Sequence, residues 1–456
     1  MIAPARLAAH RVLRAVHTGR SDLARALERA RRELADPRDR ALTGEITLGV
    51  LRRRAALDHV VGQIASRPPT AMTPAVLDIL RAAAYQVLHL DRVPPHAAVR
   101  DAVALAREVG PPQAAGFVNA VLRGLVDERR PVTLPDHPAC SSNDPAAMHR
   151  DAALDYLSIT LSHPRWLVER WLNRHGLAAA AAWAQFNNRP APVTLRANPH
   201  RTSAAELRAA LDAAGVHTTP TRLAPHGLVV TTGDPASTPC AHDGSFLVQE
   251  EASQLVLELV DPPVGGRVLD LCAAPGGKTA GLAPSVGARG LIVAAALRPR
   301  RVALLARTLS RAGAPRVAVV RLDATAPLPF GEVFDRVLVD APCSGLGVIR
   351  RDPDIRWKRT SRDLGDFARR QLAMLERAAT AVRPGGRLVY ATCSSEPEEN
   401  EAVIARFRAG QPRFRPVVPE RLVPGSVLDR EGFLRTLPFR DGVDAFFGAV
   451  LVRETP

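Results

Sequence analysis

Apolar side chains recur every three or four residues through most of the first 130 positions. The clearest repeats are Leu7, Val12 and Val16; Leu23, Leu27 and Leu34; Leu42, Ile46 and Val50; Leu57, Val61 and Ile64; Leu77, Leu80 and Val87; and Phe117, Val121 and Leu125. This spacing predicts amphipathic helices. Proline pairs at 68–69 and 94–95 separate them. We therefore expect an all-α bundle over residues 1–132.

The pattern changes after this bundle. Residues 133–155 are rich in Pro, Ser, Asn and Asp, which is typical of a linker. Beyond them, residues 156–245 predict a helix through 166–172, a strand at 193–196, a helix over 204–214 and a strand near 228–230. That alternation indicates a small α+β subdomain.

Short apolar runs alternate with helical stretches over residues 246–456. The runs lie at 267–271, 291–294, 317–322, 336–340 and 387–392. Such alternation is typical of a parallel, doubly wound sheet. The fold class expected is therefore multidomain, with an all-α bundle, a small α+β subdomain and a Rossmann-like α/β domain.

Net charge adds a candidate partner to this picture. The chain has 61 basic and 46 acidic residues, a formal charge of +15, and only Lys278 and Lys358 are lysines. Residues 1–135 carry 21 arginines against 13 acidic residues, so +8 of that charge lies on the predicted bundle. A basic helical face suits a polyanion such as RNA. The alternative is that these arginines only keep an alanine-rich bundle soluble.

The cysteines and the lack of long apolar runs exclude several classes of protein. Cys140, Cys240, Cys272, Cys343 and Cys393 form no CxxC pair and are odd in number, so we expect neither a metal site nor a disulfide framework. No stretch approaches the ~18 apolar residues of a membrane span. The beginning of the sequence lacks a signal-type apolar core. We expect a cytoplasmic protein with no membrane partner.

A glycine pair follows the first predicted strand of the α/β domain. Gly276 and Gly277 would let the backbone approach a ligand at the start of the next helix. Residues 277–279 match the end of a phosphate-binding P-loop. However, Cys272 stands where that loop's first glycine belongs, and Pro275 lacks an N–H group. Asp270 at the strand end fits a nucleoside site of the methyltransferase type better; a tight turn without a ligand is the alternative.

Two cysteines and a carboxylate follow the fourth and fifth strands of this domain. Because ligands bind beyond the carboxyl ends of parallel strands, Asp340, Cys343 and Cys393 are predicted to share one crevice. A lone cysteine is more often a core residue, but this trio indicates chemistry. A thiolate that adds to carbon 6 of a pyrimidine makes carbon 5 nucleophilic enough to accept a methyl group. A carboxyl group at ring N3 would stabilise the developing charge, and a second acid/base group would assist release.

These motifs resemble the NOP/Sun family of RNA cytosine-5 methyltransferases. The matching blocks are residues 272–278, 340–345, 347–351, 354–357, 390–394 and 397–400. Residues 163–171 and 193–196 resemble the family's RNA-recognition-like subdomain, and the N-terminus resembles a NusB-type RNA-binding domain. The whole arrangement is similar to bacterial Sun/Fmu-type methyltransferases of 16S ribosomal RNA. It implies a NusB-like domain over 1–132, a linker over 133–155, the subdomain over 156–245 and a Rossmann-like methyltransferase domain over 246–456.

The resemblance also assigns roles. It implies methyl transfer from S-adenosyl-L-methionine to carbon 5 of a cytosine in 16S ribosomal RNA, free or in an early assembly particle, with no DNA substrate. Cys393 would be the nucleophile, Cys343 would assist release, and Asp340 would contact the base and the donor. The donor would be bound by Cys272, Ala273, Ala274, Pro275, Gly276, Gly277, Lys278, Ala296, Leu297, Asp323 and Asp340. DNA cytosine methyltransferases use the position of Cys343 instead, so the choice of Cys393 rests on the family.

The sequence departs from the family pattern at three positions. Ala296 stands where an acidic residue usually holds the donor's ribose hydroxyls. Phe439 and Ala445 stand where a histidine and a glycine are common. These changes keep two alternatives open. One is an RNA-binding antitermination or assembly factor whose methyltransferase domain has decayed; the other is the same chemistry on transfer RNA or 23S ribosomal RNA.

Overall fold

The computed structural model describes residues 2–127, 132–138, 150–314 and 316–455. The chain forms two compact units. The first comprises Met1–Pro190 with Ile349–Lys358, and the second comprises Ala191–Val348 with Arg359–Pro456. Cys140 and positions 139–149 of the predicted linker lie outside the described residues. The domain limits at 132, 155 and 245 stay a prediction.

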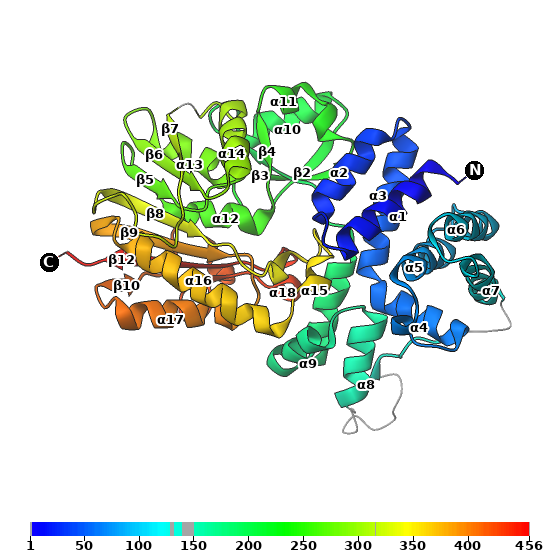
Figure 1. Cartoon of the computed structure of the whole chain (residues 1–456). Coiled ribbons are helices and arrows are strands. Elements are labelled where there is room, and N and C mark those ends of the chain that lie inside the picture. Colours follow the sequence, from blue (N-terminus) through cyan, green and yellow to red (C-terminus); the bar gives the residue numbers. More distant parts are fainter. Residues whose placement is uncertain (1, 128–131, 139–149, 315, 456) are drawn as a thin grey trace. The chain divides into compact units, whose positions relative to one another are not determined.

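The first unit is helical, as the periodicity predicts (Figure 1). Its helices are α1 (Pro4–His17), α2 (Leu23–Glu33), α3 (Pro37–Arg52), α4 (Arg54–Ala65), α5 (Pro74–His89), α6 (Pro95–Val109), α7 (Ala114–Val126), α8 (Arg150–Asp155), α9 (Arg165–Asn188) and α15 (Ile355–Lys358). Proline occupies the first position of α1, α3, α5 and α6, where its missing N–H costs no helical hydrogen bond. Asp22 and Asp36 cap α2 and α3 by accepting from backbone N–H groups.

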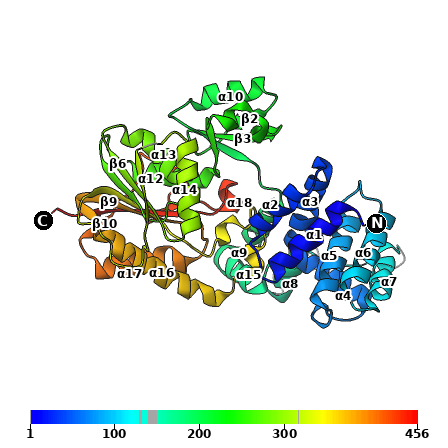
Figure 2. The same cartoon turned by 45° about the horizontal axis from the view of Figure 1, so that its top comes forward.

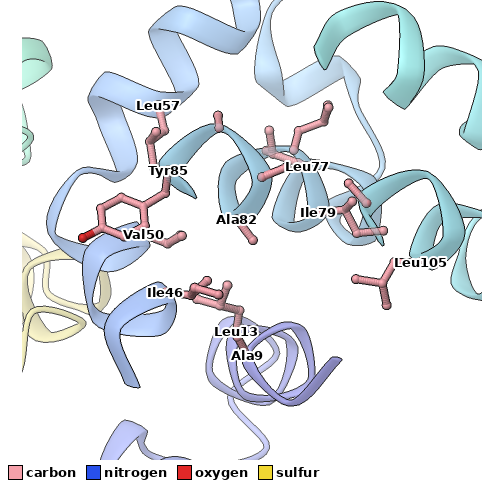
Figure 3. Packing of buried hydrophobic residues seen from close by; sticks show 14 of the residues in the cluster. Ala9, Leu13, Ile46, Val50, Leu57, Leu77, Ile79, Ala82, Tyr85 and Leu105 are labelled. Atoms are coloured by element: carbon pink, nitrogen blue, oxygen red, sulfur yellow. The ribbon is translucent and has the colours of Figure 1, made fainter. Parts of the chain in front are cut away.

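Helices α1, α3, α5 and α6 enclose the apolar core of this bundle (Figure 3). Leu13, Ile46 and Leu80 are fully buried there. Helix α3 approaches α5 so closely that a Cβ atom on Gly49 would lie 1.9 Å from Cζ of Tyr85. The tyrosine hydroxyl donates a hydrogen bond of 2.6 Å to Glu45. A glycine at position 49 is therefore a packing requirement.

Ten residues that follow the Cys343 motif in sequence pack within the helical unit. Arg356 is fully buried there and donates to the carbonyl of Ser162 and to Oδ1 of Asn188, both at 2.9 Å. Trp357 donates its indole N–H to the carbonyl of Leu51 at 2.8 Å. Burial lowers the pKa of Arg356 well below its ordinary value, and the charge of Arg52 adds to that shift. Carbonyl and amide oxygens therefore accept from the two terminal nitrogens of Arg356, whereas its Nε is buried without a partner among the described residues.

A small antiparallel sheet begins the second unit (Figure 2). Its order is β2-β3-β1-β4, with β1 at Thr194–Ala197, β2 at His217–Pro220, β3 at Gly227–Thr232 and β4 at Phe246–Val248. Helix α10 (Ala204–Ala213) packs Leu207 and Leu211 against Leu195 and Leu228 of the sheet. The sequence pattern predicted β1, α10 and β3. It missed β2, which is polar and mostly exposed, and β4, which is three residues long.

The larger sheet has the order β10-β12-β9-β8-β5-β6-β7, with β11 paired to β12. Its strands are β5 (Arg267–Asp270), β6 (Leu291–Ala296), β7 (Val317–Arg321), β8 (Phe334–Asp340), β9 (Val382–Thr392), β10 (Phe414–Pro416), β11 (Leu434–Arg435) and β12 (Phe447–Arg453). Strands β5 to β9 are parallel, at the places that the sequence predicts. The sequence pattern did not predict the strands after β9, which make the sheet mixed: β12 runs antiparallel to β9 and β10 antiparallel to β12.

Helices cover both faces of this sheet (Figure 1). They are α12 (Glu251–Val260), α13 (Gly277–Val286) and α14 (Pro299–Arg311) on one side, and α16 (Ser361–Ala379) and α17 (Glu401–Gly410) on the other. Side chains alternate along each strand, so Val268 and Leu338 face the first group while Leu269 and Val337 face the second. Fully buried parallel strands explain the continuous apolar runs in the sequence.

The strand order reverses between β5 and β8, because β6 and β7 lie on one side of β5 and β8 and β9 on the other. Ligands of open α/β sheets bind at such a switch point, beyond the carboxyl ends of the strands. The loops after β5, β8 and β9 carry the motifs that the sequence singled out. Separately, no helix among the described residues is long and apolar enough to cross a membrane.

Replacing Gly49 by alanine tests the packing of α3 on α5. Since the new methyl group overlaps the Tyr85 ring, we expect Gly49→Ala to destabilise the first unit by about 1–3 kcal/mol. Urea unfolding followed by tryptophan fluorescence measures this, because Trp166, Trp171, Trp183 and Trp357 all lie in that unit.

The matched control is Gly116→Ala in α7, where a Cβ meets nothing within 4 Å. There the loss of unfolded-state entropy should stabilise the unit by about 0.4–1 kcal/mol. Equal unfolding midpoints for the two variants would contradict the close helix packing.

Candidate active site

Cys343 and Cys393 meet beyond the ends of two neighbouring strands. Strands β8 and β9 pair in parallel with Asp340 opposite Ala391, so the loops that follow start at the same edge of the sheet. The two Sγ atoms lie 3.1 Å apart, at hydrogen-bond distance, and both side chains are half-buried. The structure therefore brings together the two thiols that the sequence predicts to share a crevice.

The contact between the thiols affects their ionisation. The hydrogen bond with Cys393 raises the pKa of Cys343 most, followed by burial and by the negative charges of Cys393 and Glu399. Cys343 thus stays protonated at neutral pH. Either sulfur can be the donor of the hydrogen bond between the two thiols.

Asp340, the last residue of β8, forms an ion pair with Lys278. The Nζ atom of Lys278 lies 2.7 Å from Oδ2 of Asp340. It also lies 5.8 Å from the centre of the Phe446 ring. The lysine side chain is 12% exposed and the aspartate 28%, so this carboxylate can be reached by a ligand. Sequence reasoning assigned Lys278 to the donor loop, and the structure places its charge on the predicted catalytic aspartate.

The loop after β5 contains a buried carboxylate with one unsatisfied oxygen. Oδ2 of Asp270 accepts a hydrogen bond of 2.7 Å from the hydroxyl of Thr279, whereas Oδ1 is buried without a partner among the described residues. Burial raises the pKa of Asp270 from 3.8 to about 7, and the Asp340 charge adds to the shift. Burial and nearby carboxylates also raise the pKa of Cys272. Cys272 is thus an inert thiol rather than a third nucleophile.

Glycine is needed in this loop for two different reasons. Gly276 has a φ of +112°, and a Cβ there would come within 3.0–3.2 Å of Leu305 and Thr308 on α14. Gly277 opens α13, and a Cβ there would meet nothing within 4 Å. The backbone at Gly277 therefore borders open space, which a ligand could occupy. Ala273 is tied to β6 by a hydrogen bond from its N–H to the carbonyl of Ala295 at 2.9 Å.

The ends of β6 and β7 complete the predicted donor set. Ala296 ends β6 opposite Arg321, and the next residue, Leu297, is 53% exposed. Asp323 is exposed after β7, and its Oδ1 accepts from the backbone and hydroxyl of Thr325. The structure thus confirms that no acid occupies the end of β6. The unsatisfied Asp270 oxygen, the open Gly277 backbone and the exposed Leu297 fit a nucleoside-containing donor.

The remaining departures from the family pattern lie beside the cysteine loops. Ala445 is buried, and its backbone N–H donates to the carbonyl of Gly347 at 3.0 Å. A Cβ on Gly347 would lie 2.0 Å from the Ala445 carbonyl oxygen, so this glycine is required. Phe439 lies in the short helix α18 (Pro438–Asp441) and is half-buried.

Sequence reasoning missed the role of Glu399. This residue appeared only as part of a motif block, yet its carboxylate bonds to Ser344 and Ser394, the residues that follow the two cysteines. A buried glutamate six positions after a strand-end cysteine gives no periodic signal, so only the tertiary structure shows this contact. Within the described residues, no cluster of three or more His, Cys, Asp or Glu side chains has a metal-binding arrangement.

Substitution of Asp270 by asparagine tests its buried environment. Between pH 4 and 7 the folded chain retains a proton that the unfolded chain has released, so Asp270 makes the protein less stable as the pH rises through this window. The amide of an asparagine at this position cannot ionise and still accepts from Thr279. We expect the unfolding temperature of Asp270→Asn, relative to the unsubstituted protein, to be higher at pH 7.5 than at pH 4, measured by calorimetry.

Asp335→Asn is the control, for which we expect the opposite change of stability with pH. Hydrogen bonds from Arg267 and Arg383 outweigh burial and lower the pKa of Asp335, so its stabilisation is present at neutral pH and lost in acid. Asp335→Asn should therefore lower the unfolding temperature more at pH 7.5 than at pH 4. The same pH trend for both variants would contradict the assignment of Asp270.

Three family models match parts of this chain. The 16S rRNA methyltransferase RsmB/F family model matches residues 257–452, the NusB family model matches residues 3–127, and a ferredoxin-like domain of RsmF/B-like methyltransferases matches residues 163–236. These matches confirm the predicted fold class, and the structural likeness below supports it.

Two curated relatives and one solved structure extend over nearly the whole chain. A probable ribosomal RNA small subunit methyltransferase B of Bacillus subtilis is 35% identical and covers 91% of this chain and 90% of its own length. Ribosomal RNA small subunit methyltransferase B of Vibrio cholerae is 33% identical, with 98% and 96% covered. The crystal structure of PH0851 superposes with a TM-score of 0.81 at 26% identity, with 100% and 99% covered. The chain therefore belongs to the RsmB/F family of 16S rRNA methyltransferases, which use S-adenosyl-L-methionine.

Proposed function

We propose that this protein methylates carbon 5 of a cytosine in 16S ribosomal RNA, in the cytoplasm, through a covalent bond between Cys393 and the base. The observation that carries the proposal is the pair of sulfur atoms 3.1 Å apart, with Asp340 on the adjoining strand end. A methyl transfer to oxygen or to an exocyclic nitrogen needs no thiol. Two thiols at the point where strand ends meet favour addition to a ring carbon.

The donor, S-adenosyl-L-methionine, supplies an electrophilic methyl group when bound. We assign its binding to the loop of residues 272–278, with Leu297 and Asp323 at the ends of the neighbouring strands. Asp270 and Thr279 hold that loop in shape through their hydrogen bond. Ala296 cannot bond to ribose hydroxyls, and loss of one such contact weakens binding by roughly 1–3 kcal/mol.

Cys393 is assigned as the nucleophile because residues 390–394 resemble the family motif that carries it. Its sulfur, as a thiolate, would form a bond to carbon 6 of the base, with the Cys343 sulfur 3.1 Å away. Once that bond exists, Cys393 no longer carries charge, so two of the causes that raise the pKa of Cys343 disappear. Cys343 can then release its own proton to water and, as a thiolate, accept the carbon 5 proton. As that proton leaves, the bond between carbon 6 and sulfur breaks and its electron pair returns to Cys393.

Asp340 and Lys278 are assigned to the polar edge of the base. The ammonium group fixes the orientation of the carboxylate at 2.7 Å and adds positive charge where the ring gains electron density during thiolate addition. Because this ion pair is largely shielded from water, it is screened less than a surface pair. The proposed site therefore supplies electrostatic stabilisation of the ring as well as a nucleophile.

The helical unit supports an RNA substrate. Helices α1 and α2 line a groove of about 700 Å³ whose rim includes Arg11, Arg20, Arg25 and Arg29. Phosphate groups are neutralised by such arginines, with a marked salt dependence. The relatives described above are named as methyltransferases of small-subunit ribosomal RNA, one of them as a probable one, which is why 16S RNA, free or in an early particle, is the proposed substrate.

Incubation with donor and 16S RNA from cells that lack this gene tests the function. We expect 5-methylcytosine at one position, and a loss of product by at least about 10³-fold in Cys393→Ala, because the base can no longer be activated. Bisulfite sequencing of the RNA measures both. Product formation by Cys393→Ala at the rate of the unsubstituted enzyme would contradict the assignment.

Donor titration by calorimetry serves as the control for that experiment. Ala296 is the observation that favours a second candidate, an RNA-binding protein whose methyltransferase domain has decayed. Binding of the donor in the micromolar range supports the enzyme. Absence of binding at millimolar donor, together with intact RNA binding, supports the decayed domain.

Replacing Cys343 by alanine distinguishes the roles of the two thiols. Because the base for the carbon 5 proton is lost while Cys393 remains, we expect Cys343→Ala to form a covalent RNA complex that accumulates over many minutes. Denaturing gel electrophoresis with labelled RNA measures it. The double variant Cys343→Ala with Cys393→Ala should form none, and normal product release by the single variant would refute the role of Cys343.

A further inference from the structure

A buried carboxylate connects the loops that carry the two cysteines. Glu399 is fully buried and accepts hydrogen bonds of 2.5 Å from the hydroxyl groups of both Ser344 and Ser394. It also accepts from the backbone N–H of Ser344 at 2.8 Å. Each serine directly follows one of the two cysteines. A single side chain thus bonds to both catalytic loops.

Every polar group bonded to this carboxylate is a donor. Oε1 accepts from the Ser344 N–H and from the side-chain amide of Gln371 at 3.0 Å, while Oε2 accepts the two hydroxyl protons. The hydroxyl oxygens in turn accept from backbone N–H groups, that of Ser344 from Leu346 and that of Ser394 from Glu396. The site therefore suits an acceptor with four lone-pair positions and a negative charge. An amide in its place would set an N–H group against other donors.

The neighbouring residues hold Glu399 in place. Tyr390 donates its hydroxyl proton to the Glu399 carbonyl at 2.6 Å. Asn400 accepts from Thr392 at 2.6 Å and donates to the carbonyl of Ser394 at 3.0 Å. These contacts tie the segment after Cys393 back to the end of β9. The carboxylate is thus supported by the sheet rather than by a free loop.

We propose that Glu399 is a positioning residue that fixes the separation of the two thiols by bonding to the serines that follow them. The proposal rests on the proposed function for its catalytic part. Glu399 contacts neither thiol directly. It acts through Ser344 and Ser394, and through the electrostatic field that it exerts on Cys343.

The charge has a separable effect. Glu399 is one of the groups that raise the pKa of Cys343, together with Cys393 and burial. After Cys393 bonds to the base, burial and the Glu399 charge are the causes that still raise the pKa of Cys343. Once Cys343 has lost its own proton, this charge makes its thiolate the stronger base for the carbon 5 proton. A carboxylate with a purely structural role would leave the titration of Cys343 unchanged.

Two substitutions separate the effect of the Glu399 charge from the effect of its side-chain length. Glu399→Gln keeps the length of the side chain and removes the charge, whereas Glu399→Asp keeps the charge and shortens the bridge by one methylene. The matched control is Glu251→Gln, which neutralises another buried carboxylate of the same unit, one that accepts from the backbone of Leu223 and Ala224. Calorimetry establishes that each variant is folded before any comparison.

The first measurement needs no RNA. The intact protein is alkylated with iodoacetamide across a range of pH values, and modification of the Cys343 peptide is quantified by mass spectrometry. We expect the midpoint for Cys343 to fall by about one pH unit in Glu399→Gln, the scale of one nearby charge. Glu399→Asp and Glu251→Gln should keep the original midpoint within about 0.3 units.

The second measurement follows turnover. We expect kcat to fall by about tenfold or more in both Glu399 variants, with KM for RNA changed by less than about twofold. The covalent complex should accumulate in Glu399→Gln, because Cys343 is then the weaker base. If Glu399→Gln does not fold, Ser394→Ala removes one hydroxyl contact and is measured in the same way; its kcat must then fall without a change in KM.

The proposal is overturned if Glu399→Gln and Glu251→Gln show the same alkylation profile and the same kcat. A failure of the proposed function looks different. In that case the unsubstituted protein yields no 5-methylcytosine, while the alkylation profiles still show whether Glu399 controls Cys343.

Discussion

The parallel register between β8 and β9 is the constraint on which the rest of the site depends. Because Asp340 pairs with Ala391, the two loops begin side by side and their sulfur atoms come to 3.1 Å. A slip of one residue would turn each side chain of β9 to the opposite face of the sheet. The buried contacts of Val389 and Tyr390 on opposite faces exclude that slip. Core packing thereby sets the distance between two reactive groups.

Two charged arrangements near the thiols then have different roles, the ion pair of Lys278 with Asp340 and the carboxylate of Glu399. Lys278 holds Asp340 at the edge of the crevice, where positive charge is useful to a base that gains electron density. Glu399 places negative charge behind the thiols, where it keeps one of them protonated. The donor loop adds a second buried carboxylate, Asp270, whose pKa is raised by that burial.

Sequence patterns predicted the helices of the first unit and the parallel strands well, because both depend on local periodicity and on breaks such as Pro74 and Pro95. The convergence of Cys343 and Cys393 followed from the general geometry of parallel sheets. Contacts between residues far apart in sequence gave no such signal. The ion pair of Lys278 with Asp340 spans 62 positions, and Arg356 bonds within the helical unit across 194 positions. Strand β2 was missed because its polar, exposed residues do not alternate with apolar ones.

The division of labour between the two thiols is the central claim, and one measurement tests it most directly. RNA that carries 5-fluorocytosine at the target position has no carbon 5 proton to lose, so the bond between sulfur and carbon 6 persists. Digestion of the trapped complex and peptide mass spectrometry identify the attached cysteine. The family assignment predicts attachment to Cys393, whose sulfur lies 3.1 Å from that of Cys343. Attachment to Cys343 would contradict the account.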